Sequence, residues 1–258
     1  MNDIDATQAP LLDHLVELRQ RVQQPPAELL LTFLIGLYFE KQILAFLVEP
    51  LSHAGQKRIV NIGMFEGFFV QLKVAFFAGL MLAFPVIANQ LWQFVAPGLY
   101  RKEKQALLPF LLATPLLFIA GAATAYYFAV PAALHFLLGY QGDLGGIEQE
   151  ALPSVGSYLD FIMQFVLAFG VAFLLPVLLM LLERAGIVTR KQLVGARRYA
   201  ILGCFAVALV LAPADAGSMI MLGVLLMLLF ELALIGMWFT ERKRSREIAQ
   251  EATEGAAE

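Results

Sequence analysis

A short segment between two long apolar runs combines side chains that could bind a cation. Residues 89–104 read Asn-Gln-Leu-Trp-Gln-Phe-Val-Ala-Pro-Gly-Leu-Tyr-Arg-Lys-Glu-Lys, so Trp92 and Phe94 precede a Pro-Gly turn and one carboxylate, Glu103, follows it among basic neighbours. Aromatic rings favour the membrane–water boundary, and Lys and Arg mark its cytoplasmic side. A carboxylate at such a boundary can accept two parallel hydrogen bonds from a guanidinium. Glu103 is therefore a candidate receptor for a cationic ligand.

A second carboxylate, Glu17, lies in a segment with a helical pattern. In residues 10–24, leucine and valine recur at helical spacing, and the charged side chains, among them Glu17 and Arg21, share the opposite side. This pattern predicts an amphipathic helix. From the residues alone both glutamates also have a plain interpretation. Glu17 can pair with Arg21 on a solvated helix face for about 0.3 kcal/mol, and basic neighbours can balance the charge of Glu103.

The composition is that of a helical membrane protein. Of the 258 residues, 60% are apolar and 15% are charged, whereas a soluble domain is about half apolar and a quarter charged. The apolar residues gather in blocks long enough to cross a hydrocarbon core, which needs about 20 residues. They do not alternate as the strands of a membrane barrel do. We therefore predict an all-α membrane protein.

Six apolar blocks predict six transmembrane helices. The first, at 29–48, is the weakest because Glu40 and Lys41 interrupt it, and an outside loop is expected at 49–67. The other spans are expected at about 68–88, 107–131, 158–182, 199–212 and 219–239. The fifth span would reach only about 21 Å, short of a core of about 30 Å. The predicted organisation is an N-terminal cytoplasmic helix in 1–24, a six-helix domain in 25–240 and a charged, fraying tail in 241–258.

The basic residues predict the orientation of these spans. Six crossings put both termini on one side, and the segments on that side carry 14 of the 18 lysines and arginines. Because basic residues collect on the cytoplasmic side, we expect both termini in the cytoplasm. The acidic N-terminus resembles neither a cleavable signal nor an Arg-rich transit peptide, which favours a prokaryotic inner membrane.

The motifs of common enzymes are absent from the sequence. The three histidines, at 14, 53 and 135, are scattered among different segments, and there is no phosphate loop, cysteine pair or nucleophile elbow. We therefore expect no enzyme, no metal and no cofactor. A net charge of −3 gives no indication of nucleic-acid binding.

Two segments give the chain a resemblance to a known family. Residues 13–21, Asp-His-Leu-Val-Glu-Leu-Arg-Gln-Arg, and residues 89–104 resemble the N-terminal signature and first cytoplasmic loop of TatC, the multi-spanning subunit of the twin-arginine translocase. The resemblance covers about residues 10–240 and implies a concave bundle with short helices five and six. It also implies that Glu17 and Glu103 help to bind the twin-arginine motif of signal peptides. Phe94, and more weakly Gln90 and Trp92, are further candidates for this binding.

The resemblance also implies partners and a cellular location. The expected partners are twin-arginine signal peptides of folded cargo, TatA/TatB-type single-span subunits and further copies of the chain in a complex. The expected location is the prokaryotic cytoplasmic (inner) membrane, where the protonmotive force drives export. On this interpretation the chain binds signal peptides and performs no covalent chemistry.

Three further positions match the family. Glu231, preceded by Phe230, is expected near the middle of span six, where a carboxylate must face the bundle interior or a water-filled dent because exposure to lipid is costly. Asp215 matches the acidic residue of the turn before span six, and is also a common turn residue. Pro50 matches a proline of the first outside loop, which it would shape.

Departures from the family leave alternatives open. Leu174, Ala212 and Met219 stand where many relatives carry polar groups, and in relatives the turn region helps to dock the single-span subunits. The rival function is a proton- or cation-coupled solute transporter that uses Glu231 and Asp215. A passive assembly scaffold is a third possibility.

Overall fold

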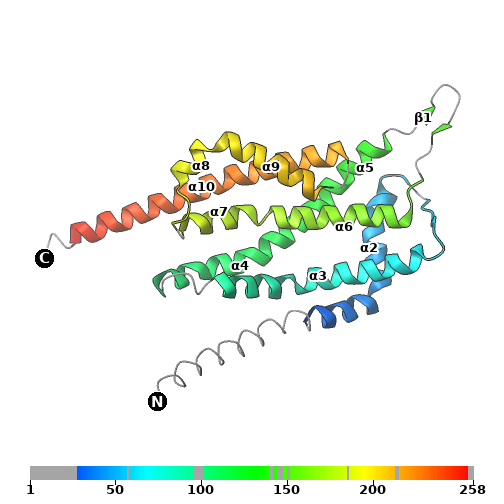
Figure 1. Ribbon diagram of the computed structural model, residues 1–258, viewed down its shortest axis with the longest axis horizontal. Helices are drawn as coiled ribbons and strands as arrows, with labels where there is room; N and C mark the ends of the chain where they lie inside the picture. The colour runs from blue at the N-terminus through cyan, green and yellow to red at the C-terminus, as the bar shows by residue number, and fades with distance from the viewer. Residues whose placement is uncertain are drawn as a thin grey trace, which may run out of the picture.

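The computed structural model describes residues 28–56, 58–95, 101–139, 142–143, 148–149, 152–184, 186–212 and 215–254. In 91–95, 101–112, 142–143, 148–149 and 243–254 it describes the backbone alone. The regular structure of the described residues is helical apart from one small hairpin and an isolated bridge between Val60 and Ser154, and the long helices run side by side (Figure 1). The all-α prediction is therefore confirmed.

The elements follow one another as a series of helices. They are the first helix Glu28–Tyr38, α2 (Glu40–His53), α3 (Glu66–Val95), α4 (Arg101–Thr124), the π-helical turn η2 (Ala125–Ala129), α5 (Val130–Leu138), strands β1 (Gly142–Asp143) and β2 (Glu148–Gln149), α6 (Val155–Ala172), α7 (Leu175–Arg184), α8 (Arg190–Gly195), α9 (Arg197–Leu211) and α10 (Ala216–Glu254). Strands β1 and β2 are antiparallel, with Gly142 opposite Gln149.

Among the residues that the structure describes, four helical segments are long and apolar enough to cross a membrane, and they match four of the predicted spans. They are Glu66–Gln90, Ala113–Leu138, Val155–Arg184 and Ala216–Arg242. The first helix and α2 form a fifth candidate span if the two are counted as one. They meet at a bend of 75° beside Glu40, which is where charged residues interrupt the apolar run in the sequence. Helix α9 has only 15 residues, as its short apolar block predicts.

Prolines explain two irregularities inside the long segments. Pro176 has no N–H to donate to the carbonyl of Ala172, and α6 ends at Ala172 before α7 resumes at Leu175. Between α4 and α5 the chain instead passes through η2, which ends two residues before Pro131. A wider π-helical turn relaxes the hydrogen-bond ladder there, so the helix continues to Leu138 beyond the predicted end at 131.

The expected fraying of the tail is wrong for the backbone up to Glu254. Helix α10 continues without a break from Ala216 to Glu254. Residues 241–254 contain neither glycine nor proline and are rich in Glu, Arg and Ala. These residues are good helix formers, so a high charge density does not by itself end the helix.

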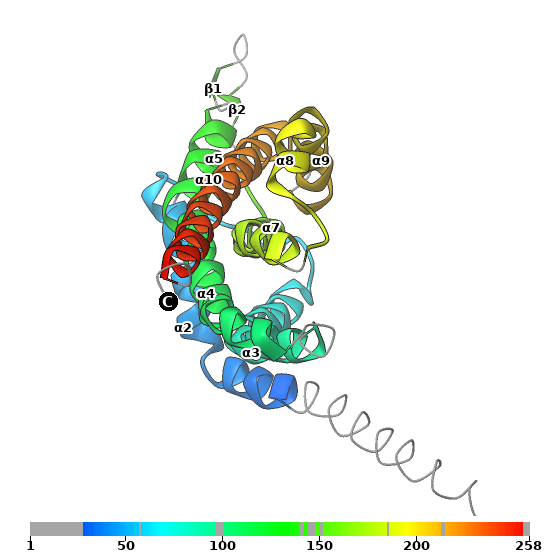
Figure 2. The ribbon, with the colours of Figure 1, turned by 90° about the vertical axis from the view of Figure 1, so that its left-hand side faces the viewer.

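The bundle has two ends that matter for function (Figure 1). At the α8 end lie the end of α3, the start of α4 and the end of α7. At the hairpin end lie the β1–β2 hairpin, the end of α5 and the starts of α3 and α6. Viewed from the α8 end, α3, α4, α10 and α9 form an arc, with α7 on its inner side (Figure 2).

Close packing of two glycines joins α4 to α6. A Cβ added at Gly170 would lie 2.6 Å from the ring of Phe118, and one added at Gly121 would meet the carbonyl of Phe169. Phe118 is buried and stacked on Phe84 with ring centroids 3.5 Å apart, so its ring has little room to move. Glycine at these positions therefore allows the two helices to approach each other.

Gly170→Ala is expected to lower the thermal unfolding midpoint of the purified protein, since overpacking costs about 1–3 kcal/mol. Gly203→Ala in α9 is the matched control, because nothing lies within 4 Å of its added Cβ. Alanine there should be neutral or stabilising, since glycine inside a helix costs about 0.5–1 kcal/mol. Equal midpoints for Gly170→Ala and the unchanged protein would contradict the packing argument.

Candidate functional site

The residues of the predicted signal-peptide site gather at the α8 end, as far as the backbone places them. Gln90, Trp92 and Phe94 lie in the last turns of α3, and Glu103 lies in the first turn of α4 (Figure 1). The side chains of Trp92, Phe94 and Glu103, and the whole of Glu17, lie outside the described residues. Only Gln90 can therefore be assessed by its contacts.

Gln90 holds the start of the first helix against the end of α3. Its Nε2 donates to Oε2 of Glu28 at 3.1 Å, and both residues are partly buried. Glu28 is thus a further carboxylate at this end, which the sequence analysis did not select. Its only signal was an acidic residue at the edge of the first apolar run.

Glu231 lies on the side of α10 that faces α8 and α9. Its Oε2 accepts a hydrogen bond from Nη2 of Arg197, the first residue of α9, at 2.8 Å. Both side chains are partly exposed and border a hollow of about 150 Å³. A charged residue in an apolar helix is tolerated when it has such a partner. The sequence analysis expected Glu231 in the bundle interior or in a water-filled dent. The structure places it in a hollow at the surface of the bundle, paired with Arg197.

Asp215 caps the start of α10. Its Oδ1 accepts from the backbone N–H of Ser218 at 2.7 Å, and its carbonyl accepts from that of Met219 at 3.2 Å. From α6, Nε2 of Gln164 donates to the carbonyl of Ala212 at 3.0 Å. Side-chain caps satisfy the unpaired N–H groups of a first helical turn. These bonds therefore support a structural role for Asp215.

Pro50 lies inside α2, which continues to His53, so the predicted loop from residue 49 begins later than expected. Proline has no N–H to donate to the carbonyl four residues earlier, which belongs to Phe46. The hydroxyl of Tyr126, in η2, donates to this carbonyl at 2.6 Å. The ring of Tyr126 also stacks on Phe46, with centroids 4.2 Å apart. A tyrosine from a distant helix thus replaces the missing backbone donor.

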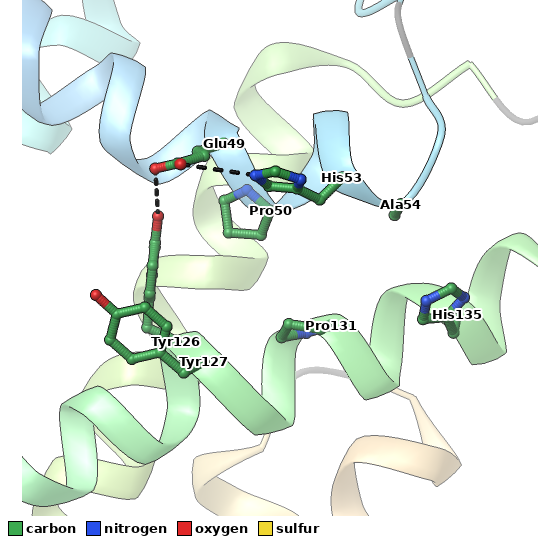
Figure 3. Close-up of a pocket in the computed structure, with 8 residues that line it drawn as sticks. All are labelled: Glu49, Pro50, His53, Ala54, Tyr126, Tyr127, Pro131 and His135. Carbon is green, nitrogen blue, oxygen red and sulfur yellow. Dashed lines mark hydrogen bonds and ion pairs between the residues drawn. The ribbon is translucent and has the colours of Figure 1, made fainter.

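A hollow of about 330 Å³ opens beside Pro50, between α2 and the η2–α5 segment (Figure 3). It is lined by Glu49, Pro50, His53, Ala54, Tyr126, Tyr127, Pro131 and His135. The carboxylate of Glu49 accepts from the Tyr126 hydroxyl at 3.4 Å and lies 3.6 Å from Nε2 of His53. Pro50 therefore shapes both a helix and a cavity wall.

Two further polar contacts fasten α3 to α6. Nζ of Lys73 lies 2.8 Å from Oδ2 of Asp160, and both side chains are half-exposed. At the hairpin end, Glu66 accepts from the backbone N–H groups of Gly63 and Gly156 at 3.1 and 2.8 Å. These bonds tie the loop before α3 to the first turn of α6.

Comparison with known proteins identifies the relatives of the chain. The family described as Sec-independent protein translocase protein (TatC) matches residues 13–224. The Sec-independent protein translocase protein TatC of Magnetococcus marinus is 41% identical over 252 residues, which cover 97% of this chain and 92% of that protein. The TatC of Aquifex aeolicus is 36% identical over 239 residues, covering 91% and 98%. A crystal structure of the twin-arginine translocase receptor TatC matches with a TM-score of 0.73 and 35% identity, over 86% of this chain and 96% of that one.

The chain belongs to the TatC family. It is therefore a membrane protein with transmembrane helices and a component of a Tat translocase, in a family of translocase components rather than enzymes. Of the atypical positions, Leu174 lies in the break between α6 and α7, and Ala212 is buried just after α9. Met219, in the first turn of α10, is partly buried.

Proposed function

We propose that this TatC-family chain is the signal-peptide receptor core of a twin-arginine translocase that exports folded proteins. In this proposal the carboxylates of Glu17 and Glu103 bind the paired arginines of the signal peptide. Phe94 offers an aromatic face to a guanidinium or to the apolar part of the signal, and Gln90 and Trp92 complete the surface. Guanidinium suits this role because it is planar, permanently charged and matches a carboxylate with two parallel bonds.

The observation that carries the proposal is the hydrogen bond between Gln90 and Glu28. It fixes the start of the first helix beside the last turns of α3, the helix that α4 follows in the sequence. Glu17 precedes Glu28 by eleven residues, which at full extension reach about 40 Å. In this proposal Glu17 acts at the same end of the bundle as Trp92, Phe94 and Glu103.

We further propose six membrane crossings with both termini in the cytoplasm. The bent pair Glu28–Tyr38 and Glu40–His53 would form one crossing and short α9 another, in addition to the four long segments. The α8 end carries the basic residues of α8 and the starts of α4 and α9, which supports a cytoplasmic position. TatA/TatB-type subunits and further copies of the chain are the proposed partners in the inner membrane. The transporter alternative loses support because Glu231 is paired with Arg197 and Asp215 caps a helix.

The test is peptide binding to the purified full-length protein in lipid nanodiscs. A labelled twin-arginine signal peptide is expected to bind at least about tenfold more tightly than its Lys-Lys version, because lysine cannot reproduce the paired hydrogen bonds of arginine. Fluorescence anisotropy measures both affinities. Equal affinities in a folded sample would overturn the receptor role and favour a passive scaffold.

A further inference from the structure

A second polar site lies between α8, α9 and α10, away from the end of α3 and the start of α4. The hollow of about 150 Å³ is lined by Arg190, Val194, Arg197, Glu231, Leu234, Ile235 and Trp238. Arg190 is held in place by a capping box, in which Thr189 and Gln192 exchange side-chain-to-backbone hydrogen bonds. Two guanidinium groups thus border a pocket whose remaining wall is mostly apolar.

Each of the two arginines has hydrogen-bond donors that its ion pair does not use. Arg197 uses Nη2 for Glu231 at 2.8 Å, and Arg190 directs Nη1 towards Glu241 at a longer 3.4 Å. Nε of Arg190 is buried and has no partner among the described residues. A guanidinium has five N–H donors, and a buried donor without an acceptor is unfavourable. The buried Nε of Arg190 therefore indicates a missing acceptor.

The charges around the hollow favour an anion as that acceptor. The basic residues described on α8, the start of α9 and the adjoining part of α10 are Arg190, Lys191, Arg197, Arg198 and Arg242. The carboxylates that face them are Glu231 and Glu241, each in an ion pair, and α7 ends nearby with Glu183 and Arg184. The hollow itself is lined by two guanidinium groups and one carboxylate, so an anion would find a net positive site.

The surroundings indicate that the anion is attached to an apolar chain. Leu228, Leu232, Ile235 and Phe239 are exposed at helical spacing along α10 and continue the hollow as an apolar stripe. Trp238 stands at the end of this stripe, with the guanidinium of Arg242 5.3 Å from its ring centroid. Tryptophan and arginine at the end of an apolar helix are typical of the membrane–water boundary. Trp238 and Arg242 would lie at a membrane–water boundary whichever side of the membrane is cytoplasmic.

We propose that the hollow binds an anionic phospholipid. The phosphate lies between Arg190 and Arg197, where two guanidinium groups can donate to its oxygens, and the acyl chains follow the exposed stripe of α10. Basic pockets between transmembrane helices are suited to such headgroups. A bound lipid at this site joins α8 and α9 to α10 through a shared anion.

Quenching of Trp238 fluorescence by brominated lipids tests the proposal. The full-length protein with Trp92→Phe keeps Trp238 as its one tryptophan and is placed in phosphatidylcholine vesicles with a small fraction of brominated phosphatidylglycerol or brominated phosphatidylcholine. The phosphatidylglycerol is expected to be preferred about fivefold, since each basic group near the surface contributes about 1 kcal/mol. Arg190→Gln should abolish most of this preference.

Matched variants separate the site from general charge effects. Arg198→Gln removes the same charge, but its guanidinium donates to the Tyr199 hydroxyl and is not among the residues that line the hollow, so the preference should persist. Arg197→Gln combined with Glu231→Gln removes the ion pair without leaving an unpaired carboxylate, and should weaken the preference. Equal quenching by both lipids, or equal effects of Arg190→Gln and Arg198→Gln, would overturn the proposal. Displacement of the brominated lipid by inorganic phosphate would assign the site to free phosphate instead.

Discussion

Replacing Glu103 by glutamine is expected to weaken the binding of a twin-arginine signal peptide by about 10- to 100-fold, because a hydrogen bond to a charged partner is worth about 1.5–3 kcal/mol. Glutamine keeps the shape of the side chain but cannot accept two charge-assisted bonds from a guanidinium. Glu17→Gln should weaken binding in the same direction. Binding of the Lys-Lys peptide should change much less in both variants. Titration of both labelled peptides into nanodisc samples of the unchanged protein and the two variants measures the six affinities.

The double variant tests whether the two carboxylates bind the same arginine pair. If Glu17 and Glu103 act on one motif, the combined loss should differ from the sum of the single losses, as expected for residues with a shared partner. Glu241→Gln is the control, because it removes a negative charge from α10, where Glu241 pairs with Arg190, and should leave Arg-dependent binding in place. A similar loss in the control would reduce the role of Glu103 to general electrostatics.

Tyr126→Phe is expected to destabilise the protein by about 1–3 kcal/mol, because it removes the donor that satisfies a partly buried carbonyl. The Tyr126 hydroxyl donates to the carbonyl of Phe46 at 2.6 Å, and Pro50 has no N–H for that carbonyl. In a membrane interior an unsatisfied backbone group has no water to bind. Unfolding in a mixed-micelle denaturant series, followed by circular dichroism, measures the loss.

The same measurement in a Pro50→Ala background decides the mechanism. Alanine restores the N–H at residue 50, which can donate to the Phe46 carbonyl, so Tyr126→Phe should then lose less than about half as much stability. Tyr127→Phe is the control, because its ring is exposed in the hollow beside Pro50 and its effect should be small. An equal loss with and without Pro50 would show that Tyr126 acts through its other contacts.

Local patterns predicted the helices well, whereas features set by distant contacts were missed. Apolar block lengths gave the four long spans and the short α9, and the interruption by Glu40 and Lys41 coincides with the 75° bend. The helix breaks before Pro176 but continues through a π-helical turn before Pro131. Residue types alone could not predict which outcome occurs at which proline, because proline permits both. The sequence analysis did not predict that the helix continues to Glu254. The high charge of the tail suggested fraying, whereas the good helix propensity of its residues favours a helix.

In the candidate site, too, local features were predicted and contacts between distant residues were not. The types and order of residues in 89–104 selected the region where α3 ends and α4 begins, and the backbone places Phe94 in the last turn of α3 and Glu103 in the first turn of α4. The contact of Gln90 with Glu28 joins residues 62 positions apart, and that of Glu231 with Arg197 joins residues 34 apart. Neither has a local pattern in the sequence. The role of Glu231 therefore could not be assigned before its partner was seen.

The bond between Tyr126 and the Phe46 carbonyl also bears on the order in which the protein is assembled in its membrane. A second tyrosine, Tyr158 in α6, donates to the neighbouring carbonyl of Leu47 at 2.8 Å. Both donors are synthesised long after α2 leaves the ribosome. Until Tyr126 arrives, the Phe46 carbonyl, which Pro50 leaves without a backbone donor, needs water or another donor. The packing of α2 is therefore completed late, when the second and third long segments, Ala113–Leu138 and Val155–Arg184, have been inserted, and a chain halted before Tyr126 should hold α2 at a hydrated position.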